Sequence, residues 1–582
     1  MKNLRAALWI GLALILIVNV QVWIKEFGAQ DAAAAAQAQR ALEQERRDNP
    51  LAAAVPTVPT SESAGNPAAT PAATPADGAV PQATAPGAVP TAAAAVATPA
   101  SDAAAGVLNV TTDVLDVDIS LRGAELVRAD LLLYPVHKGG SEVVRLLRDN
   151  GPGDEYVLQT GLTGAGAGDF PTHLALFETP FTSFRLEEGL DELHVPFTWK
   201  SPSGVEVTKT LTFRRGSYRI DVKYEVTNGS EGAWSVAPYA QIQRDMPVLK
   251  RSYFNVDSYS FTGPAYYDGK KYEKLKITNE SDARFNQEFT GGWFAALEHH
   301  FVSAIVPPGD EKHHYTLRVR QNEFLATDVG PTRTVAAGAT DTITQTLFVG
   351  PKLQRQLTAI HPELGRAADF GKLTFLSRPL FWLLDKAHVV FNNWGLAIIA
   401  ITFLLKLLFY PLSEASGRSM AKMKLVAPRM KQLQETYKDD RQKLGAAMME
   451  LYKKEKVNPA AGCLPMLIQL PVFLAFYWVL LESVEMRQAP FFGWLQDLSS
   501  RDPYFVLPVI MAGAMFLQYK LQPTPADPVQ AKVFMVLPLV MSVMFAFFPA
   551  GLVLYWVTNT ILTIAQQWNI NRRIAAAQPV RD

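Results

Sequence analysis

The chain has 582 residues, of which 48% are hydrophobic, and its 55 basic and 55 acidic side chains cancel to a formal net charge of zero. This length allows more than one domain, and the neutral total conceals a polar middle and a hydrophobic final third. The single cysteine, Cys463, excludes an intrachain disulfide and a cysteine-rich metal site.

The N-terminus predicts a membrane anchor over residues 1–28. Lys2 and Arg5 precede the apolar run Ala6–Ile24, which is close to the roughly 20 residues that span a bilayer. A cleavable signal peptide is the competing interpretation, because small residues follow, but its apolar core is usually only about 7–15 residues long. Basic residues before the run place the N-terminus in the cytoplasm.

Residues 29–106 are predicted to form a disordered linker. Their composition collapses to Ala, Pro, Thr, Gln and Gly. Such a segment cannot bury enough apolar surface to offset the entropy of folding. We therefore expect it to tether the anchor to the rest of the chain.

Residues 107–368 show the period of two that is typical of β-strands. Apolar Ile220, Val222 and Tyr224 alternate with polar residues, and the run ends at a turn, Asn228–Gly229. The same alternation starts at Val205 and recurs around residues 315–319. Frequent turn residues and few helical stretches predict an antiparallel β-sandwich, and the segment is long enough to bury a substantial core.

The remainder is predicted to be helical and to cross a membrane. Leu380, Leu384, Ala387 and Phe391 recur at helical spacing within an interfacial amphipathic helix at 369–394. Transmembrane helices two to six are expected at 395–412, 457–481, 504–519, 533–548 and 550–571. They are joined by a cytoplasmic helical hairpin (413–456), an outer loop (482–503) and a cytoplasmic loop (520–532), and followed by a tail (572–582).

Length and charge both favour six spans, counting the anchor. The uncharged stretch 533–571 would be about 58 Å long as one helix, twice the hydrocarbon core, so it must contain two spans. Basic residues outnumber acidic ones roughly two to one in 413–456. The outer loop contains only two basic residues, Arg487 and Arg501. This asymmetry places both termini and the hairpin in the cytoplasm, and the sandwich outside it.

Lys406 is the most informative residue. It interrupts the otherwise uncharged run Gly395–Leu412, and none of the other apolar segments contains Asp or Glu. A cation at this depth is costly and usually functional. Either its stem reaches the headgroups, or it faces a hydrated cavity. Polar residues of other spans could line such a cavity, although each could equally be a helix-packing contact: Gln469, Gln518, Thr558, Asn559, Thr563 and Gln566.

The hairpin has two open interpretations. Its arms, with Met420, Met423 and Met430 on the first, are separated by a break at Lys438, Asp439 and Asp440. The arms could pack on each other as a solvated coiled coil. Alternatively, their methionines and basic residues could form a docking surface for hydrophobic helices, the ribosome or targeting factors.

Enzymatic motifs are weak. The segment Gly263–Lys270 has the wrong spacing for a phosphate-binding loop. His299–His300 and His313–His314 are adjacent pairs, whose members point to opposite faces of a strand. We predict no catalytic residue, no metal, no cofactor and no direct nucleic-acid specificity.

The second half resembles the YidC membrane-protein insertase family over about Ser377–Arg573. The resemblance is carried by NWGLAIIAITFLLKLLFYPL, SMAKMKLVAPRMKQLQE, MMELYKKEKVNPAAGCLPMLIQLPVFLAFYWVL, SVEMRQAPFFGWLQDLSSRDPYFVLPVIMA and DPVQAKVFMVLPLVMSVMFAFFPAGLVLYWVTN. It implies a five-helix core with a hydrophilic groove, open to cytoplasm and lipid but closed to the periplasm. It also implies a periplasmic β-sandwich. The basic groove residue, usually Arg in the family, corresponds to Lys406.

The expected function is therefore insertion and folding of nascent membrane proteins in the bacterial inner membrane, without ATP hydrolysis. The groove is expected to use Lys406, Gln469, Gln518, Thr558 and Asn559. The expected greasy slide for the substrate comprises Phe473, Phe476, Tyr477, Phe505, Met511, Phe516 and Trp556. Expected partners are nascent chains, the lipid bilayer and the Sec translocon, with the ribosome and the signal recognition particle receptor as candidates. A solute transporter and an anchored carbohydrate-active enzyme are the alternatives.

Overall fold

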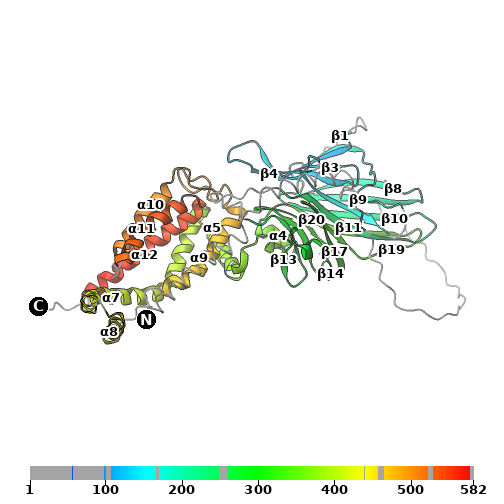
Figure 1. Cartoon of the computed structure of the whole chain (residues 1–582). Coiled ribbons are helices and arrows are strands. Elements are labelled where there is room, and N and C mark those ends of the chain that lie inside the picture. The colour runs from blue at the N-terminus through cyan, green and yellow to red at the C-terminus, as the bar shows by residue number, and fades with distance from the viewer. Residues whose placement is uncertain are drawn as a thin grey trace, which may run out of the picture.

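The computed structural model describes residues 55–56, 98–99, 106–151, 153–164, 169–247, 260–437, 440–455, 464–521 and 528–576. The predicted anchor at 1–28 lies outside these residues. Figure 1 shows a β-rich part and a helical part that meet end to end. The expected β-rich domain and helical C-terminal part are thus confirmed.

The β-rich part contains two sheets, which are antiparallel except where β2 pairs with β7. In spatial order, the first contains β1 (Thr98–Pro99), β7 (Phe181–Arg185), β2 (Val107–Thr111), β3 (Leu115–Ser120), β4 (Glu125–Pro135), β5 (Val143–Asp149), β6 (Glu155–Thr163), β11 (Trp234–Asp245), β18 (Glu323–Val329), β17 (Lys312–Arg320) and β14 (Asn286–Thr290), with β19 (Arg333–Val335) beside β11. The second contains β13 (Tyr272–Lys274), β12 (Gly263–Tyr267), β15 (Trp293–Leu297), β16 (Phe301–Val306), β20 (Thr340–Pro351), β10 (Arg219–Asn228), β9 (Val205–Arg214) and β8 (Glu192–Lys200).

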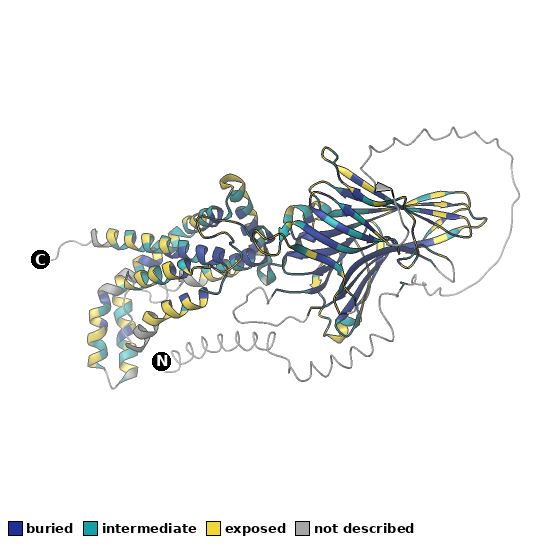
Figure 2. Ribbon diagram, turned by 90° about the horizontal axis from the view of Figure 1, so that it is seen from above, coloured by how far each residue is buried: buried dark blue, intermediate teal, exposed yellow. Residues whose placement is uncertain are grey.

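Alternation in the sequence explains the core between the sheets. In β10, Ile220, Val222 and Tyr224 are fully buried, while the intervening Lys223 and Glu225 are exposed. Successive side chains of a strand point to opposite faces, so each strand of this kind contributes one apolar face. Figure 2 shows buried residues running through both sheets, and residues from both form one hydrophobic cluster.

Three pieces of the predicted linker, 55–56, 98–99 and Gly106, lie within the described residues and contact the sandwich. The hydroxyl of Thr163 donates to the carbonyl of Pro56 at 2.9 Å, and β1 pairs with β7. The carbonyl of Gly106 accepts a hydrogen bond from the backbone N–H of Leu121 at 2.7 Å. The segment that we predicted to be a disordered linker therefore touches the β-rich part at these three points.

One short helix, α3 (Glu280–Ala283), lies within the β-rich part between β13 and β14, and three short elements lead from the sandwich into the helical part. These three are α4 (Gln354–Ile360), η3 (Leu364–Ala367) and η4 (Gly371–Leu373). The helical part contains α5 (Thr374–Phe391), α6 (Trp394–Leu408), α7 (Tyr410–Thr436), α8 (Arg441–Lys454), α9 (Leu464–Glu482), η6 (Val484–Met486), α10 (Val506–Leu521), α11 (Pro528–Phe545) and α12 (Ala550–Ala576). Helix α12 packs against α6, α7, α9 and α10.

Within the described ranges, no single helix is both long and apolar enough to cross a bilayer alone. The bent pair Trp394–Leu408 and Tyr410–Ser419 has sufficient length and composition together, and its two halves meet at 62°. Shorter apolar helices cover Ile468–Glu482, Val506–Leu521 and Met535–Phe545.

Large apolar side chains are exposed along several of these helices. Val390 of α5, Leu408 of α6, Val509 of α10 and Leu539 of α11 are each more than 60% exposed. Exposed apolar side chains, where they gather into a patch, mark a lipid or protein contact. Figure 1 shows the α7–α8 hairpin at the end of the helical part that is farthest from the sheets.

Candidate functional site

Lys406 lies in the last turn of α6, next to a bend. Asn393 caps the start of the helix, because its side chain accepts a hydrogen bond from the backbone N–H of Leu396 at 3.0 Å. The helix ends at Leu408, short of the predicted end at 412. Pro411 explains this difference, since proline lacks an N–H and suits the first turn of the following helix, α7.

The ammonium group of Lys406 points towards α12 and not along its own helix. It donates a hydrogen bond to the hydroxyl of Thr563 at 2.8 Å, and that hydroxyl donates to the carbonyl of Asn559 at 2.6 Å. No carboxylate of the described residues forms an ion pair with it. The side chain is half-buried, so the positive charge is held by neutral polar groups.

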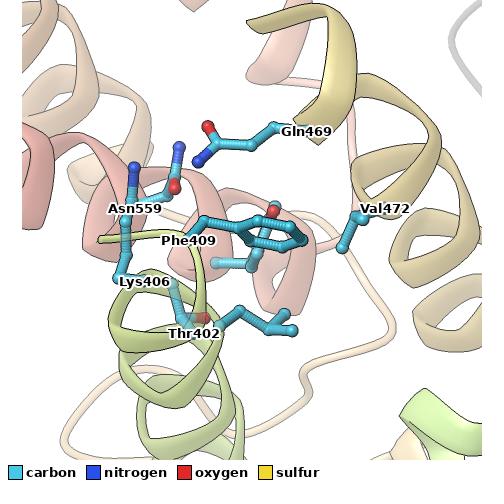
Figure 3. A pocket seen from close by; sticks show the side chains of 8 residues that line it. Thr402, Lys406, Phe409, Gln469, Val472 and Asn559 are labelled. Carbon is cyan, nitrogen blue, oxygen red and sulfur yellow. The ribbon is translucent and has the colours of Figure 1, made fainter. Parts of the chain in front are cut away.

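A small hollow lies beside Lys406, between α6, α9 and α12. Figure 3 shows the side chains of Lys406, Gln469 and Asn559 converging on it, with Phe409 and Val472 at its wall. Thr402, Leu405 and Tyr555 complete the lining. The hollow has room for about one water molecule (≈ 10 Å³).

The structure brings together three of the five predicted groove residues. Lys406, Gln469 and Asn559 line the hollow. Thr558 and Gln518 are half-buried on α12 and α10 but do not line it. Of the two further polar residues considered, Thr563 contacts Lys406 directly, while Gln566 is half-buried with an amide nitrogen that has no partner in the structure.

Sequence reasoning missed two polar lining residues. Thr402 is almost fully buried, and its hydroxyl donates to the carbonyl of Ile398 at 2.6 Å. Tyr555 is also buried. Each lies four residues before a predicted member, Lys406 or Asn559, and residues at this spacing share one face of a helix. That spacing was the signal that could have found them.

Aromatic side chains of the predicted slide form a cluster next to the hollow. The ring of Phe473 lies 4.8 Å from Trp556 and 6.0 Å from Tyr555. Tyr477 packs against Phe548 at 6.1 Å. These contacts join α9, α12 and the turn after α11 into one apolar wall.

The seven predicted slide residues differ in exposure. Phe505 and Phe516 are 40% and 46% exposed, and Phe473, Tyr477 and Trp556 are partly exposed. Phe476 and Met511 are fully buried in the helical core. These two cannot touch a substrate in this arrangement, because neighbouring helices already cover them.

The hairpin is packed on itself. Val426 and Met430 of α7 and Met448 of α8 form a small buried cluster, against which Met423 is packed. Asp440 caps α8 by accepting hydrogen bonds from the backbone N–H groups of Gln442 and Lys443 at 3.1 and 3.0 Å. Met423, Met430 and Met448 thus help to hold the two arms together, whereas Met449 is exposed. The side chain of Met420, and Lys438 and Asp439 altogether, lie outside the described residues.

Titratable groups elsewhere in the described residues pair with one another or with their neighbours. Among the described residues, no three His, Cys, Asp or Glu side chains are grouped so that they could hold a metal ion. His313 instead pairs with the buried carboxylate of Asp328 at 2.9 Å. His299 and His300 stack on each other, with ring centroids 3.8 Å apart.

Two family profiles match the chain in consecutive segments. Residues 107–383 match the YidC periplasmic domain, and residues 386–577 match the 60Kd inner membrane protein family. The first segment covers the sandwich, and the second covers the helices around Lys406. The chain is therefore an inner-membrane protein with a β-rich periplasmic domain.

Curated relatives agree with these profiles. The chain is 44% identical to the membrane protein insertase YidC of Thioalkalivibrio sulfidiphilus, with 99% of each chain covered. It is 47% identical to that of Methylococcus capsulatus, over 80% of this chain and 86% of the relative. It is 40% identical to that of Pseudomonas paraeruginosa, over 98% and 99%.

A solved structure, described as an active YidC insertase with its first transmembrane domain resolved, also matches. It covers 79% of this chain and 92% of its own, with 18% identity and a TM-score of 0.36. The relatives do not support the alternative of a solute transporter. The chain belongs to the YidC family of membrane protein insertases.

Proposed function

We propose that this insertase lowers the barrier for polar peptide by means of the hollow at Lys406. A nascent span would slide along the apolar face of the helices, while its polar flank rests in the hollow. Polar groups would then never cross the full apolar thickness of the bilayer, where each unsatisfied group costs several kcal/mol. Burial of the apolar span in lipid would draw the flank across.

This proposal rests on the observation that the Lys406 ammonium contacts neutral polar groups and no carboxylate among the described residues. The ammonium is half-buried and bonds to the Thr563 hydroxyl. A cation that is paired only with neutral groups remains able to attract a carboxylate or a carbonyl of a passing peptide. The amides of Gln469 and Asn559, on two other helices, offer further hydrogen bonds in the same hollow.

The lysine sets the kind of recognition that is available. The family usually has Arg at this position, and a guanidinium can bind a carboxylate through two parallel hydrogen bonds. Lys406 supplies a point charge with rotatable donors. We therefore propose recognition by charge and general polarity, without a fixed bidentate geometry.

The hollow must widen during insertion. In the structure it has room for about one water molecule, so a polypeptide enters only if α6, α9 and α12 separate. Apolar contact would come from the exposed or partly exposed slide residues Phe473, Tyr477, Phe505, Phe516 and Trp556. Phe476 and Met511 are left out of this surface because they are buried.

We propose six spans, with both termini and the α7–α8 hairpin in the cytoplasm. The position of the hairpin, at the end of the helical part opposite the periplasmic domain, supports this topology. The first span would be the apolar run Ala6–Ile24, and the remaining five would contain α6, α9, α10, α11 and α12. Substrates would arrive from the ribosome or the signal recognition particle receptor, with or without the Sec translocon.

An in vitro insertion assay tests the role of the charge. The substrate is a single-span protein with an acidic leader, and the variants are Lys406→Ala, Lys406→Glu and Lys406→Arg in proteoliposomes. We expect the first two to slow insertion and the third to retain it. Lys270→Ala, which changes an exposed lysine of the periplasmic domain, is the matched control. Insertion by Lys406→Glu at the wild-type rate would show that the charge has no role.

A further inference from the structure

The periplasmic domain is attached to the helical part at one end of α9. The final turn of α9 and the residues after it are buried, from Val479 to Val484. The ring nitrogen Nε2 of His299, in the turn between β15 and β16, donates to the carbonyl of Leu481 at 2.9 Å. This bond satisfies one of the carbonyl groups that the end of a helix leaves without an intrahelical partner.

Glu482, the last residue of α9, carries its carboxylate into this contact. Its side chain is only 4% exposed, and the hydroxyl of Ser260, in the periplasmic domain, donates to Oε1 at 2.7 Å. A carboxylate buried to this extent is stable only if opposite charge and hydrogen-bond donors surround it. Both are supplied from the other domain.

Two lysines of the periplasmic domain influence Glu482 through their charge. Lys352, which follows β20, is 2% exposed, and Lys274 lies on β13; both act electrostatically on the Glu482 carboxylate. Burial lowers the pKa of Lys352 to about 8, and Glu482 opposes that fall. Lys274 also forms an ion pair with Asp369, just before α5, so it has a second acidic partner.

Hydrogen bonds outside this buried group join the same two parts. The guanidinium of Arg487, in the outer loop, donates to the carbonyl of Pro135 in β4 at 2.8 Å, and the side-chain amide of Gln488 donates to the same carbonyl at 2.8 Å. The ammonium of Lys138 donates to the backbone carbonyl of Gln488 at 3.0 Å and to that of Gln496. The loop after α9 is thus also bound by the end of β4 and the turn that follows it.

We infer that Glu482, Ser260 and Lys352 form a charged latch through which the periplasmic domain fixes the outer end of α9. This inference rests on the proposed function, because α9 also carries Gln469, at the hollow, and Phe473 and Tyr477, on the slide. A helix fixed at one end pivots about that end, so the latch would limit how far α9 moves from α6 and α12. Glu482 is therefore a positioning residue for insertion.

The latch makes a prediction about charge balance. Removing one member of a buried pair leaves the other charge uncompensated, whereas replacing both by neutral groups of similar size is tolerated. Glu482→Gln keeps the shape of the side chain and can still accept a hydrogen bond from Ser260, but it removes the larger of the two acidic influences on Lys352 and leaves only that of Glu298. The double variant Glu482→Gln/Lys352→Met removes both charges and should restore the contact.

Hydrogen exchange of the full-length protein in nanodiscs tests the latch itself. We expect the backbone amides from Leu481 to Val484 to exchange about tenfold faster or more in Glu482→Gln, and to return to near the wild-type rate in the double variant. Glu188→Gln, at an exposed position of the periplasmic domain, is the matched control. Amides of β10 and β20 report whether the domain is folded. Unchanged exchange at 481–484 in Glu482→Gln, with the domain folded, would overturn the inference.

A second readout follows the position of α9. In a Cys463→Ser background, Val472→Cys places a thiol at the wall of the hollow, and its rate of reaction with a water-soluble maleimide is measured. We expect Glu482→Gln to raise this rate several-fold, to slow insertion of the acidic-leader substrate, and to be rescued in both by Lys352→Met. Loss without rescue would indicate general destabilisation and overturn the latch.

The two proposals can fail separately. If Lys406→Glu inserts normally while the Glu482 and Lys352 variants behave as expected in exchange and labelling, the role of the charge in the hollow is wrong and the latch stands. If the Lys406 variants lose insertion while Glu482→Gln changes neither exchange nor labelling, the latch is wrong and the proposed function stands.

Discussion

Lys406 and Thr563 are joined by a hydrogen bond of 2.8 Å that connects α6 to α12, and the Thr563 hydroxyl in turn donates a hydrogen bond to the carbonyl of Asn559. The hydroxyl thus accepts from the cation and donates to the backbone at the same time. The threonine accepts one of the hydrogen bonds that the ammonium can donate, but it does not neutralise the positive charge. The charge is held in place and remains open to a substrate.

The first prediction concerns this hydroxyl. Thr563→Val keeps the shape of the side chain but removes the acceptor for the ammonium. We expect a loss of stability of about 1–3 kcal/mol, the usual cost for a hydrogen bond to a charged group, measured by thermal unfolding in detergent. Insertion of the acidic-leader substrate should persist, because the charge remains.

Thr558→Val is the control for this change, since Thr558 lies on the same helix but does not line the hollow. If Thr563→Val reduced insertion as far as Lys406→Ala does, the hydroxyl would contribute to function beyond holding the lysine.

The second prediction separates packing from substrate contact among the slide residues. Phe476 is fully buried against Tyr555, with ring centroids 4.9 Å apart, whereas Phe516 is 46% exposed. We expect Phe476→Ala to cost about 3–5 kcal/mol of stability, as large-to-small changes in a core do. Phe516→Ala should leave the unfolding temperature nearly unchanged but reduce crosslinking of a stalled nascent chain to α10. Equal loss of stability in both variants would contradict this division.

The pattern of apolar residues predicted the buried face of the strands, but it could not separate covered from exposed residues among those predicted for the slide. In β10, polar residues mark the solvent face between Ile220, Val222 and Tyr224, so the buried face can be identified. In α9 and α10 nearly every residue around the helix is apolar, so polar residues do not mark the exposed face. Sequence alone could not tell that Phe476 is covered while Phe473 is partly exposed.

Three residues that line the hollow could be named from the sequence, because polar side chains stand out in apolar segments. A charge in an apolar run identifies Lys406, and amides on other spans identify Gln469 and Asn559. Thr402 and Tyr555 required the additional step of projecting each helix face. Contacts between distant segments could not be predicted, because no local pattern shows that Glu482 contacts Ser260, which lies 222 residues earlier.

The third prediction concerns pH. Glu485, in η6 of the outer loop, accepts a hydrogen bond from the backbone N–H of Gln354 at 3.3 Å, and Asp385 and Arg355 are the charged groups that act on it. Burial raises the pKa of Glu485 from 4.5 to about 7. A group whose pKa is raised in the folded state contributes stability that is fully present below its unfolded value and is lost as the pH rises.

Stability should therefore fall between pH 4.5 and about 7 through this group. We expect the unfolding temperature of the wild type to decrease over this range, and that of Glu485→Gln to decrease less, because the amide cannot ionise. Glu142→Gln, at an exposed position on the turn after β4, should follow the wild type. A Glu485→Gln profile that is parallel to the wild type would show that other groups cause the decrease.

The last prediction concerns a close approach between Gly395, in the first turn of α6, and the aromatic ring of Phe491, in the outer loop. A β-carbon added at Gly395 would lie 2.0 Å from the ring, far inside van der Waals contact, and the loop is fixed there because the side-chain amide of Asn393 donates to the carbonyl of Phe491 at 3.3 Å. We expect Gly395→Ala to cost about 1–3 kcal/mol, as overpacking does. In Gly395→Ala/Phe491→Ala the two losses of stability should not add, because the residues are in contact.

Gly513→Ala, on α10 with open space around it, should instead stabilise the protein by about 0.5–1 kcal/mol through helix propensity. The unfolding temperatures of these three variants and of Phe491→Ala alone test both the expected destabilisation and the expected stabilisation. If the two losses added in the double variant, the ring of Phe491 would not be packed against α6.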